Sequence, residues 1–400
     1  MKKLFSVVLS LILVFCLSGA VRAQNKTLRF DEQGKFTILQ ISDPQDDHHP
    51  AYDMLNLIKL AIEQSDPDLV VFSGDIVDDL YNEGDSGIDD EDGREGVCVY
   101  DGNGDILFDE TFENVRVACG AIFEEVEQRQ IPFAVALGNN DYKTGLTADD
   151  WLDVFNDYDM NLTTDEGADD DNRIDFRLNI LSSASDDTAF ALWIMDTGLD
   201  EVKRGQIDWF LSESNSLKSE NNGEAIPSIV FQHIPVDDIG NLFERCHIWD
   251  AGATLKGSRL YRLNKEIAVG RWTSVRKPGT TTDEFTAWKE SGGVLAAFFG
   301  HLHTQGYSGT WQGIELGLTY GSQFAKKAPY GFRVVTLNEN NPGGYCSDLY
   351  LYEGSVSDGD AEIVKQINEP YPVYNSFKEA FVGFFRNTFD NLKKILSDMF

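Results

Sequence analysis

The chain has 400 residues, with 33 lysines and arginines against 67 aspartates and glutamates, and its formal net charge is −34. A surface this acidic repels nucleic acid and anionic membranes, so we expect neither as a partner. The length is ample for a large hydrophobic core.

The first residues are predicted to be a signal peptide, 1–23, and not part of the fold. Two lysines precede an apolar run over 4–17, and small residues around Ala23 are typical of a cleavage site. The run is shorter than the ~20 residues that span a bilayer. We therefore expect an exported protein, periplasmic or secreted. A lipoprotein anchor at Cys16 is the less favoured alternative, because bulky Phe15 precedes it.

Removing the signal peptide leaves 30 basic and 67 acidic residues, a formal charge of −37. It also leaves four cysteines, an even number, which in an exported chain allows two disulfides in any of three pairings. None of the four shows metal-ligand spacing: Cys98, Cys119, Cys246 and Cys346.

Continuous apolar segments alternate with helical patterns along the chain. The segments predicted to be strands are 35–42, 68–74, 132–138, 189–196, 228–233 and 294–300, and shorter strand patterns continue to Tyr352. Apolar residues at three- and four-residue spacing predict helices at 51–65, 112–129 and 204–217. This alternation predicts an α/β fold with a sheet buried on both faces, largely parallel at first and antiparallel towards the end.

One large domain over 24–360 is expected, with an acidic, glycine-rich surface insertion at about 81–111. The insertion contains calcium-loop spacing that begins at Asp101, but Ile106 stands where the loop needs glycine. Residues 167–176 fail the same test. A solvated acidic loop is the favoured interpretation of both segments.

The C-terminal segment 371–400 predicts an amphipathic helix. Its apolar face holds Phe377, Phe381, Phe385, Phe389, Leu392, Leu396 and Met399. We expect this face to pack on the domain or on a partner subunit. Binding to a membrane surface is the less favoured alternative, because acidic and basic residues mix on the polar face.

Polar residues follow the predicted strands at the points where the strands end. In an open α/β sheet the carboxyl ends of the strands face one crevice, so these side chains can converge. Two carboxylates, two carboxamides and three imidazoles form a mixed oxygen and nitrogen shell that suits two adjacent divalent or trivalent cations. The predicted ligands are Asp43, Gln45, Asp75, Asn139, His233, His301 and His303.

The order Asp-x-Gln, Gly-Asp, Gly-Asn, His, Gly-His-x-His resembles the calcineurin-like metallophosphoesterase superfamily, in particular its branch of small purple-acid-phosphatase-like proteins of plants and fungi. The resemblance covers roughly residues 27–340 without the acidic insertion. It implies a four-layer α/β/β/α sandwich with a dinuclear centre, in which a hydroxide shared by the metals attacks phosphorus. Asp75 would bridge a first metal held by Asp43, Gln45 and His303 and a second held by Asn139, His233 and His301.

Two positions depart from the family pattern, because Gln45 and Asn140 stand where the superfamily usually has histidine. A neutral amide oxygen at Gln45 still ligates but favours manganese, magnesium or calcium over zinc or iron; the alternative is a hydrogen bond to a ligand. The family's second histidine, steadied by the following aspartate (here Asp141), is thought to protonate the leaving oxygen or bind phosphate. Asn140 cannot donate a proton at neutral pH, which removes a contribution of typically ~10²–10⁴-fold.

His48 and His49 lie in the loop that follows the first strand, where His48 is the candidate for a substitute proton donor. Two exposed loop histidines without a role is the favoured interpretation of this pair. The sequence thus predicts an exported metal-dependent phosphoesterase that acts on small phosphate esters with good leaving groups. The rivals are a catalytically inert protein that binds metal and phosphate, and a phosphodiesterase.

Overall fold

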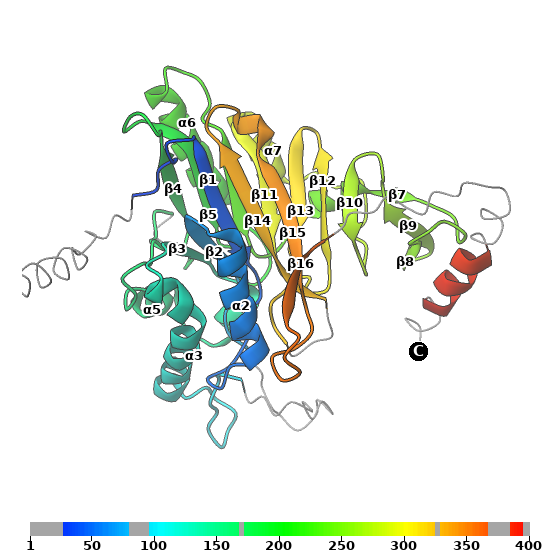
Figure 1. Cartoon of the computed structure of the whole chain (residues 1–400), viewed down its shortest axis with the longest axis horizontal. Helices are drawn as coiled ribbons and strands as arrows, with labels where there is room; N and C mark the ends of the chain where they lie inside the picture. The colour runs from blue at the N-terminus through cyan, green and yellow to red at the C-terminus, as the bar shows by residue number, and fades with distance from the viewer. Residues whose placement is uncertain (1–26, 80–95, 168–171, 325–328, 367–384, 395–400) are drawn as a thin grey trace, which may run out of the picture.

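The computed structural model describes residues 27–79, 96–167, 172–324, 329–366 and 385–394. Its core is built from two mixed β-sheets (Figure 1). The first has the order β16-β15-β14-β1-β2-β3, with β1 Lys35–Ile41, β2 Leu69–Ser73, β3 Phe133–Ala136, β14 Tyr330–Asn338, β15 Cys346–Glu353 and β16 Glu362–Lys365.

The second sheet has the order β10-β12-β13-β11-β6-β5-β4. Its strands are β4 Phe176–Leu181, β5 Thr188–Met195, β6 Ser228–Gln232, β10 Ala268–Arg271, β11 Val294–Phe299, β12 Gly306–Trp311 and β13 Ile314–Leu318. Within the sheets, β1-β2-β3 and β5-β6-β11-β13 run parallel, whereas β14, β15 and β16 are antiparallel. The predicted change from parallel to antiparallel pairing is therefore observed.

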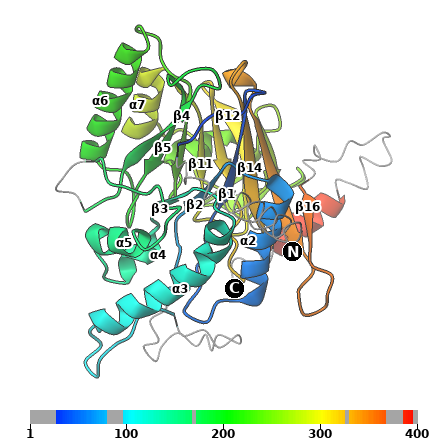
Figure 2. The ribbon, with the colours of Figure 1, turned by 60° about the vertical axis from the view of Figure 1, so that its left-hand side comes forward.

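The two sheets pack face to face and helices cover their outer faces. Successive residues of β6 point to opposite faces of the sheet. Phe231 belongs to the core between the sheets, and Val230 belongs to the core beneath the helices. Helices α2 (Tyr52–Ser65) and α3 (Phe108–Gln128) bury apolar faces against the first sheet. Helices α6 (Arg204–Glu220) and α7 (Asp283–Ser291) cover the second sheet (Figure 2). The fold is the predicted four-layer α/β/β/α sandwich.

A buried arginine joins the two sheets. Arg333 of β14 is 1% exposed, and its guanidinium donates hydrogen bonds to the Leu318 carbonyl and to three hydroxyl groups. It also lies 4.5 Å from the ring centre of Phe298 in β11. Burial lowers the pKa of Arg333 to about 10. The guanidinium is planar and its N–H groups point in fixed directions. Because the acceptors that they meet include residues of both sheets, the arginine sets the register of one sheet over the other.

The predicted strands and helices all occur, with ends shifted by a few residues. The largest difference is α3, which begins at Phe108 and not at 112. Val97, inside the predicted surface insertion, is fully buried and its carbonyl accepts a hydrogen bond from Asn114, so the insertion is packed at this residue, whereas Gly102, Asn103 and Asp105 are exposed as predicted. Residues 80–95, the rest of this segment, lie outside the described residues, as does the predicted signal peptide.

Several short elements were not predicted from the sequence. They are α4 Asn139–Lys143, α5 Ala148–Phe155, η1 Asp237–Leu242, η2 Pro342–Gly344, and a third, three-stranded sheet of β7 Phe243–Arg245, β8 Thr254–Lys256 and β9 Arg259–Leu263. The strands β4, β10 and β16 and the helix α7 were not predicted either. The small sheet projects from the β10 edge of the sandwich (Figure 1).

The C-terminal helix, described over 385–394, lies against the small sheet through its polar side. The Asn391 amide donates to the carbonyls of Ile248 (2.7 Å) and Asp250 (2.9 Å), whereas Phe389 is 70% exposed and Leu392 47% exposed. The domain therefore does not cover the apolar face over the described residues, and packing of this face on a partner subunit stays a prediction. The carbonyls of Ile248 and Asp250 lie in the loop between β7 and β8, outside the strand pairing, and the asparagine amide supplies the donors that they need.

The four cysteines are free thiols, so the two disulfides that the even count allowed do not form in this structure. Cys98 and Cys119 are buried in the core and the other two lie on separate strands or loops. Burial raises the pKa of Cys98 to about 11, which makes it a poor nucleophile. Of the helices described, none has the length and apolar character to cross a bilayer.

Candidate metal centre

The predicted ligands gather where the strand ends of both sheets meet. Asp43 and Asp75 follow β1 and β2 of the first sheet, and His233 and His301 follow β6 and β11 of the second. Because these strands run parallel within each sheet, their carboxyl ends lie at one edge of the sandwich. The loops are joined across this edge, since the Gly300 amide donates to the His233 carbonyl at 3.0 Å.

The carboxylates and imidazoles form two overlapping groups. In the first group, ligand atoms of Asp43, Asp75 and His303 all lie within 4.8 Å of one another, and in the second the same holds for Asp75, His233 and His301. Asp75 belongs to both groups, which is the position of a carboxylate that bridges two cations. All but the two solvent-side histidines are fully buried, so this is an interior charge cluster and not a surface one.

The His233 imidazole shows that the cluster is built for a cation. Its Nδ1 lies 2.9 Å from the Ser73 carbonyl oxygen, which must accept a hydrogen, so Nδ1 carries the proton. The other nitrogen, Nε2, is buried, lies 3.1 Å from Asp75 Oδ2 and makes no hydrogen bond within the described residues. Two electron-rich atoms at this distance need a proton or a metal between them. Burial opposes a charge on His233, yet Asp75 and Asp43 raise its pKa to about 10.

Asp43 and His301 have the protonation states that ligands require. Burial alone would raise the pKa of the Asp43 carboxyl, but His303 and His233 outweigh it and lower this pKa to about 2. Burial, followed by His233, lowers the pKa of His301 to about 4. An ionised carboxylate and a neutral imidazole are the forms that bind divalent cations. His303 Nε2 lies 3.1 Å from Asp43 Oδ1, and its Nδ1 contacts the Gln323 amide.

Four of the seven predicted ligands have positive φ angles, in the left-handed region that non-glycine residues seldom adopt. The angles are 49° for Asp43, 39° for Gln45, 49° for Asp75 and 70° for His301. Backbone strain of this kind costs of the order of 1–3 kcal/mol per residue and concentrates at functional sites. The strained turns redirect each side chain from its strand end into the shared crevice.

The glycines that precede the ligands are required by close packing. A Cβ on Gly74, whose φ is +85°, would lie 2.5 Å from the His233 ring. A Cβ on Gly300 would lie 1.8 Å from Ser42 Oγ and 2.7 Å from Asp43 Oδ2. The Gly-Asp and Gly-His pairs of the sequence motif therefore exist because two strand ends approach each other too closely for any side chain.

Gln45 and Asn139, the two predicted amide ligands, lie next to the two ligand groups. The backbone amide of Gln45 donates to the backbone carbonyl of Asp75 at 2.9 Å, which places residue 45 beside the residue that carries the bridging carboxylate. Asn139 begins α4, its side-chain Oδ1 is buried without a hydrogen bond among the described residues, and it lines the same cavity as His301. A buried amide oxygen that accepts no hydrogen bond suits a cation ligand.

Asn140 and Asp141 have different surroundings. The Asn140 backbone amide donates to Asp75 Oδ1 at 2.8 Å, and its side-chain Oδ1 accepts from Lys143 Nζ at 2.6 Å. Sequence reasoning missed Lys143, although it lies one helical turn after Asn140 within the same motif. The ammonium group of Lys143 brings a proton and a positive charge to the position where the family has histidine.

Asp141 serves the geometry of the loops. Its carboxylate accepts the backbone amides of Ile76 (2.8 Å), Val77 (3.1 Å) and Gly138 (2.8 Å). These amides belong to the loops after β2 and β3, so Asp141 holds both ligand-bearing loops together. Burial, with Asp75 nearby, raises the pKa of Asp141, and the three amide donors oppose that shift. The predicted catalytic aspartate is thus better described as a positioning residue.

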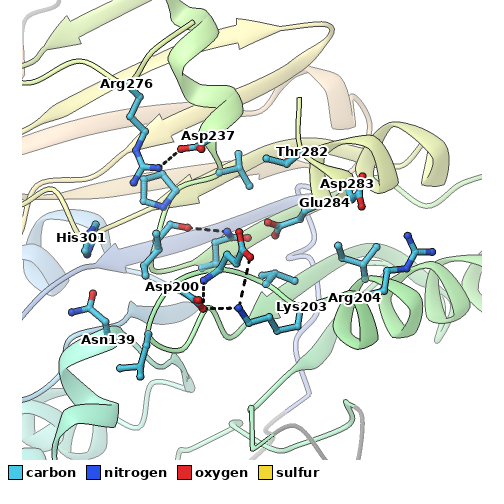
Figure 3. A pocket seen from close by; sticks show the side chains of 18 residues that line it. Asn139, Asp200, Lys203, Arg204, Asp237, Arg276, Thr282, Asp283, Glu284 and His301 are labelled. Atoms are coloured by element: carbon cyan, nitrogen blue, oxygen red, sulfur yellow. Dashed lines mark hydrogen bonds and ion pairs between the residues drawn. The ribbon is translucent and has the colours of Figure 1, made fainter. Parts of the chain in front are cut away.

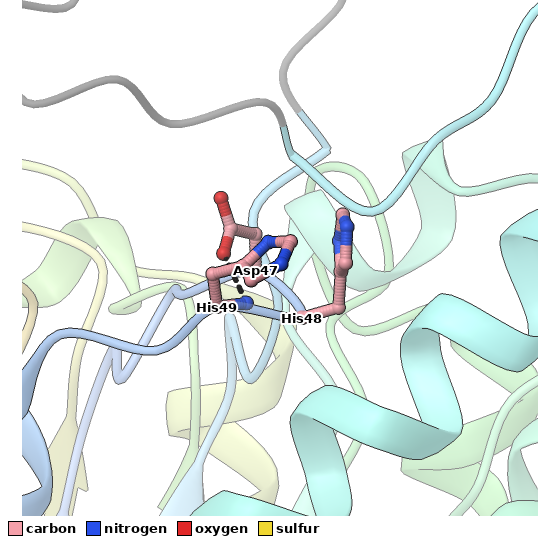
Figure 4. A group of neighbouring side chains, drawn as sticks. All are labelled: Asp47, His48 and His49. Atoms are coloured by element: carbon pink, nitrogen blue, oxygen red, sulfur yellow. Dashed lines mark hydrogen bonds between the residues drawn. The ribbon is translucent and has the colours of Figure 1, made fainter.

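His48, the predicted substitute donor, lies in a separate cluster with Asp47 and His49 (Figure 4). The two imidazole rings are 4.2 Å apart between centres, and Asp47 Oδ1 accepts the His49 backbone amide at 2.6 Å. His48 is in neither of the two ligand groups and does not line the cavity beside them. The geometry therefore favours Lys143 over His48 as the proton source.

A cavity of about 710 Å³ opens beside Asn139 and His301 (Figure 3). Its walls come from the loop before α6, from residues 234–237 and from the start of α7. Arg276 lies on one wall, paired with Asp237 at 2.6 Å, and buried Glu284 on another. Burial raises the pKa of Glu284 to about 8, so this acid is protonated at neutral pH. No sequence motif had pointed to these wall residues.

A double-sheet α/β sandwich with a buried two-cation centre at its strand ends defines the metallophosphoesterase class of proteins. The calcineurin-like phosphoesterase family matches residues 36–305, more than half of the chain, and the protein belongs to that family.

The chain is also similar to individual proteins and solved structures. It is 23% identical over 358 residues to the probable inactive purple acid phosphatase 14 of Arabidopsis thaliana, covering 78% of this chain and 77% of that protein. Among solved structures it is similar to a dimetal phosphatase from Danio rerio (12% identity, TM-score 0.43, 84% and 99% coverage). A second is GAP50, the anchor in the inner membrane complex of Plasmodium (11% identity, TM-score 0.39, 88% and 95% coverage).

Proposed function

We propose that the protein is an exported, metal-dependent phosphoesterase that hydrolyses small phosphate esters. The observation that carries the proposal is the shared position of Asp75 in two groups of ligand atoms, each of which spans no more than 4.8 Å. The first site would be Asp43, Gln45, Asp75 and His303, and the second Asp75, Asn139, His233 and His301. Two bound cations supply an activated water and offset the charge on the phosphoryl oxygens.

The protein's own groups around this centre support the same reaction. The Asn140 carbonyl oxygen is taken by Lys143, so the amide NH₂ is turned away from that contact and is available to a phosphoryl oxygen. Lys143 is 48% exposed and can give its proton to a departing oxygen and regain one from solvent. A lysine is a weaker acid than histidine at neutral pH, so esters with good leaving groups are the preferred substrates.

The adjoining cavity supports a substrate larger than phosphate itself. A volume of about 710 Å³ is in the range that holds an organic group of drug-like size. Its lining includes Leu199, Val202 and Ile234 together with three cations and five carboxyl groups, and Arg276 reaches it from the side opposite Lys203 (Figure 3). Such a cavity fits an organic phosphate whose apolar part lies against these walls and whose phosphoryl group faces Asn139.

The test compares an aryl with an alkyl phosphate under a panel of Mn²⁺, Fe²⁺, Zn²⁺ and Mg²⁺, in the natural protein and in Asn140→His. We expect the natural protein to favour the aryl ester, and the substitution to raise alkyl ester turnover by about 10-fold or more. Elemental analysis of the same samples should find two metals per chain. Equal rates on both esters, unchanged by the substitution, would contradict the proposal.

The second candidate is a catalytically inert protein that binds metal and phosphate. The absence of histidine at position 140 favours it, as does the similarity to a plant protein named probable inactive purple acid phosphatase. Such a protein would take up two cations and retain phosphate in equilibrium dialysis, yet turn over no ester at any pH or with any metal. The elemental and kinetic measurements above separate the two candidates.

A further inference from the structure

One end of the molecule has the opposite charge to the rest. Residues 243–277, which include the small sheet and β10, contain eight lysines and arginines and three carboxylates, and residues 385–394 contain three and one. These 45 residues therefore hold a third of the chain's 33 basic side chains and only four of its 67 acidic ones. We call these two segments the basic end.

Three of the cations surround a hollow. Lys256 and Arg259 face each other across the turn that joins β8 to β9, and Lys277 completes the rim over Tyr261. The hollow has a volume of about 460 Å³, and the described residues that line it include no carboxylate. Uncompensated cations around a concave surface repel one another, and an anionic group such as a phosphate relieves that repulsion.

Apolar side chains are exposed around the same end. Among the described residues ten large hydrophobic side chains are exposed, and six of these lie in the basic end: Trp249, Leu255, Val269, Phe385, Phe389 and Leu392. The C-terminal helix directs its apolar residues outward, because its polar side is held by the small sheet. Lys394 contributes to that hold through Thr254 Oγ1 and the Thr273 carbonyl, both at 3.3 Å.

We propose that the basic end docks on a membrane surface that contains anionic phospholipid. The head-group phosphates would occupy the Lys256, Arg259 and Lys277 hollow, while Phe389 and Leu392 enter the boundary between head groups and acyl chains. A bilayer offers negative charge and an apolar layer together, and the basic end presents the complement of both. An acidic surface on a second copy offers only the charge, so lipid is the better fit.

The net charge of the whole chain does not prevent this contact. At physiological ionic strength electrostatic interactions are screened beyond about 8 Å. The acidic surfaces remote from the basic end therefore repel the membrane only weakly. The docking would orient the molecule with its small sheet and C-terminal helix towards the lipid. This inference is independent of whether the metal centre turns over esters.

The experiment is co-sedimentation of the full chain with unilamellar vesicles of phosphatidylcholine, with and without about 30% phosphatidylserine. We expect binding to the anionic vesicles that weakens as salt is raised. Each basic residue near an anionic surface contributes about a fivefold factor. The variant Lys256→Glu/Arg259→Glu/Lys277→Glu should therefore lose about 100-fold or more in partitioning, and Phe389→Ser/Leu392→Ser about 10-fold or more.

Matched controls come from exposed positions at the other end. Lys35→Glu/Lys59→Glu removes cations, and Tyr52→Ser/Val117→Ser removes exposed apolar groups, and both should bind as the natural chain does. Thermal melting and metal content check that every variant is folded. The proposal is overturned if the natural chain does not bind anionic vesicles at low salt. It is equally overturned if the control variants lose as much partitioning to the vesicles as the test variants do. It is also overturned if sedimentation shows that the basic end joins two copies in place of binding lipid.

Discussion

The Lys143 ammonium nitrogen lies 2.6 Å from the Asn140 side-chain oxygen, beside the amide that donates to Asp75. This contact places a lysine where the family motif has a histidine. If the protein hydrolyses esters as proposed, a cation there would compensate in part for the missing imidazole, because it would supply both a charge for the phosphoryl group and a transferable proton.

Replacement of this lysine tests that role. We expect Lys143→Met to lower kcat/KM for an alkyl phosphate by about 10–100-fold and for an aryl phosphate by less, since the aryl leaving group needs little protonation. Lys59→Met, at an exposed position on α2, is the matched control. Equal losses on both substrates would show that Lys143 only binds phosphate.

The bridging position of Asp75 predicts an effect on both metals. In Asp75→Asn both groups of ligands lose their common carboxylate, so elemental analysis should find fewer than one metal per chain. His301→Ala touches one group and should leave about one metal. Asp149→Asn, on the exposed side of α5, should retain two. Loss of a single metal from Asp75→Asn would contradict the bridge.

Gly300→Ala tests the close approach of the two sheets at the metal centre. The added Cβ would lie 1.8 Å from Ser42 Oγ, so the loop must shift, and we expect a loss of about 1–3 kcal/mol in the free energy of unfolding together with weaker metal binding. Gly102→Ala, where a Cβ meets nothing within 4 Å, is the control. Adding Ser42→Ala to Gly300→Ala should restore part of the loss. A fully stable single variant would refute the clash.

Buried Glu284 predicts a pH dependence of stability. Its pKa is raised from 4.5 to about 8 in the folded protein, so between these values the unfolded chain releases a proton that the folded chain keeps. The Glu284 contribution therefore falls as pH rises from about 4.5 to about 8 and is constant above that. Glu284→Gln should match the natural protein near pH 4.5 and exceed it at pH 8 by a few kcal/mol.

Urea unfolding at pH 4.5, 6 and 8 measures this difference, with Glu290→Gln on the exposed side of α7 as the control. A gap between variant and natural protein that does not widen with pH would show that Glu284 is ionised in the fold.

Arg333 is predicted to be the residue whose loss costs most stability outside the metal centre. Arg333→Met keeps most of the volume but leaves the Leu318 carbonyl and three hydroxyls without their donor, and about 3–5 kcal/mol should be lost. Arg116→Met, which removes one exposed ion pair, should cost below about 1 kcal/mol. Chemical unfolding gives both values, and similar losses would contradict the role of Arg333.

The succession of strands and helices along the chain could be read from the sequence, and so could the strand ends that carry the acidic and histidine residues of the two ligand groups. The four-layer fold came from the family resemblance, and the order of strands within each sheet was not predicted. A buried strand needs a continuous apolar run, and the residue after its end must be polar or glycine, so Asp43, Asp75 and His301 are marked by their neighbours. Local chemistry decides such features, because a strand and the turn that ends it involve residues adjacent in the chain.

Contacts between distant segments were decided by the tertiary structure alone. Two of the three donors to Asp141 come from more than 60 residues away, and the cavity walls at Val202 and Glu284 come from the loop before α6 and from α7. The C-terminal helix has a clear apolar face in the sequence, yet its polar side binds the domain, because Asn391 donates to the carbonyls of Ile248 and Asp250. A periodic pattern shows which face is apolar, whereas the partner that covers either face depends on surfaces that exist only after folding.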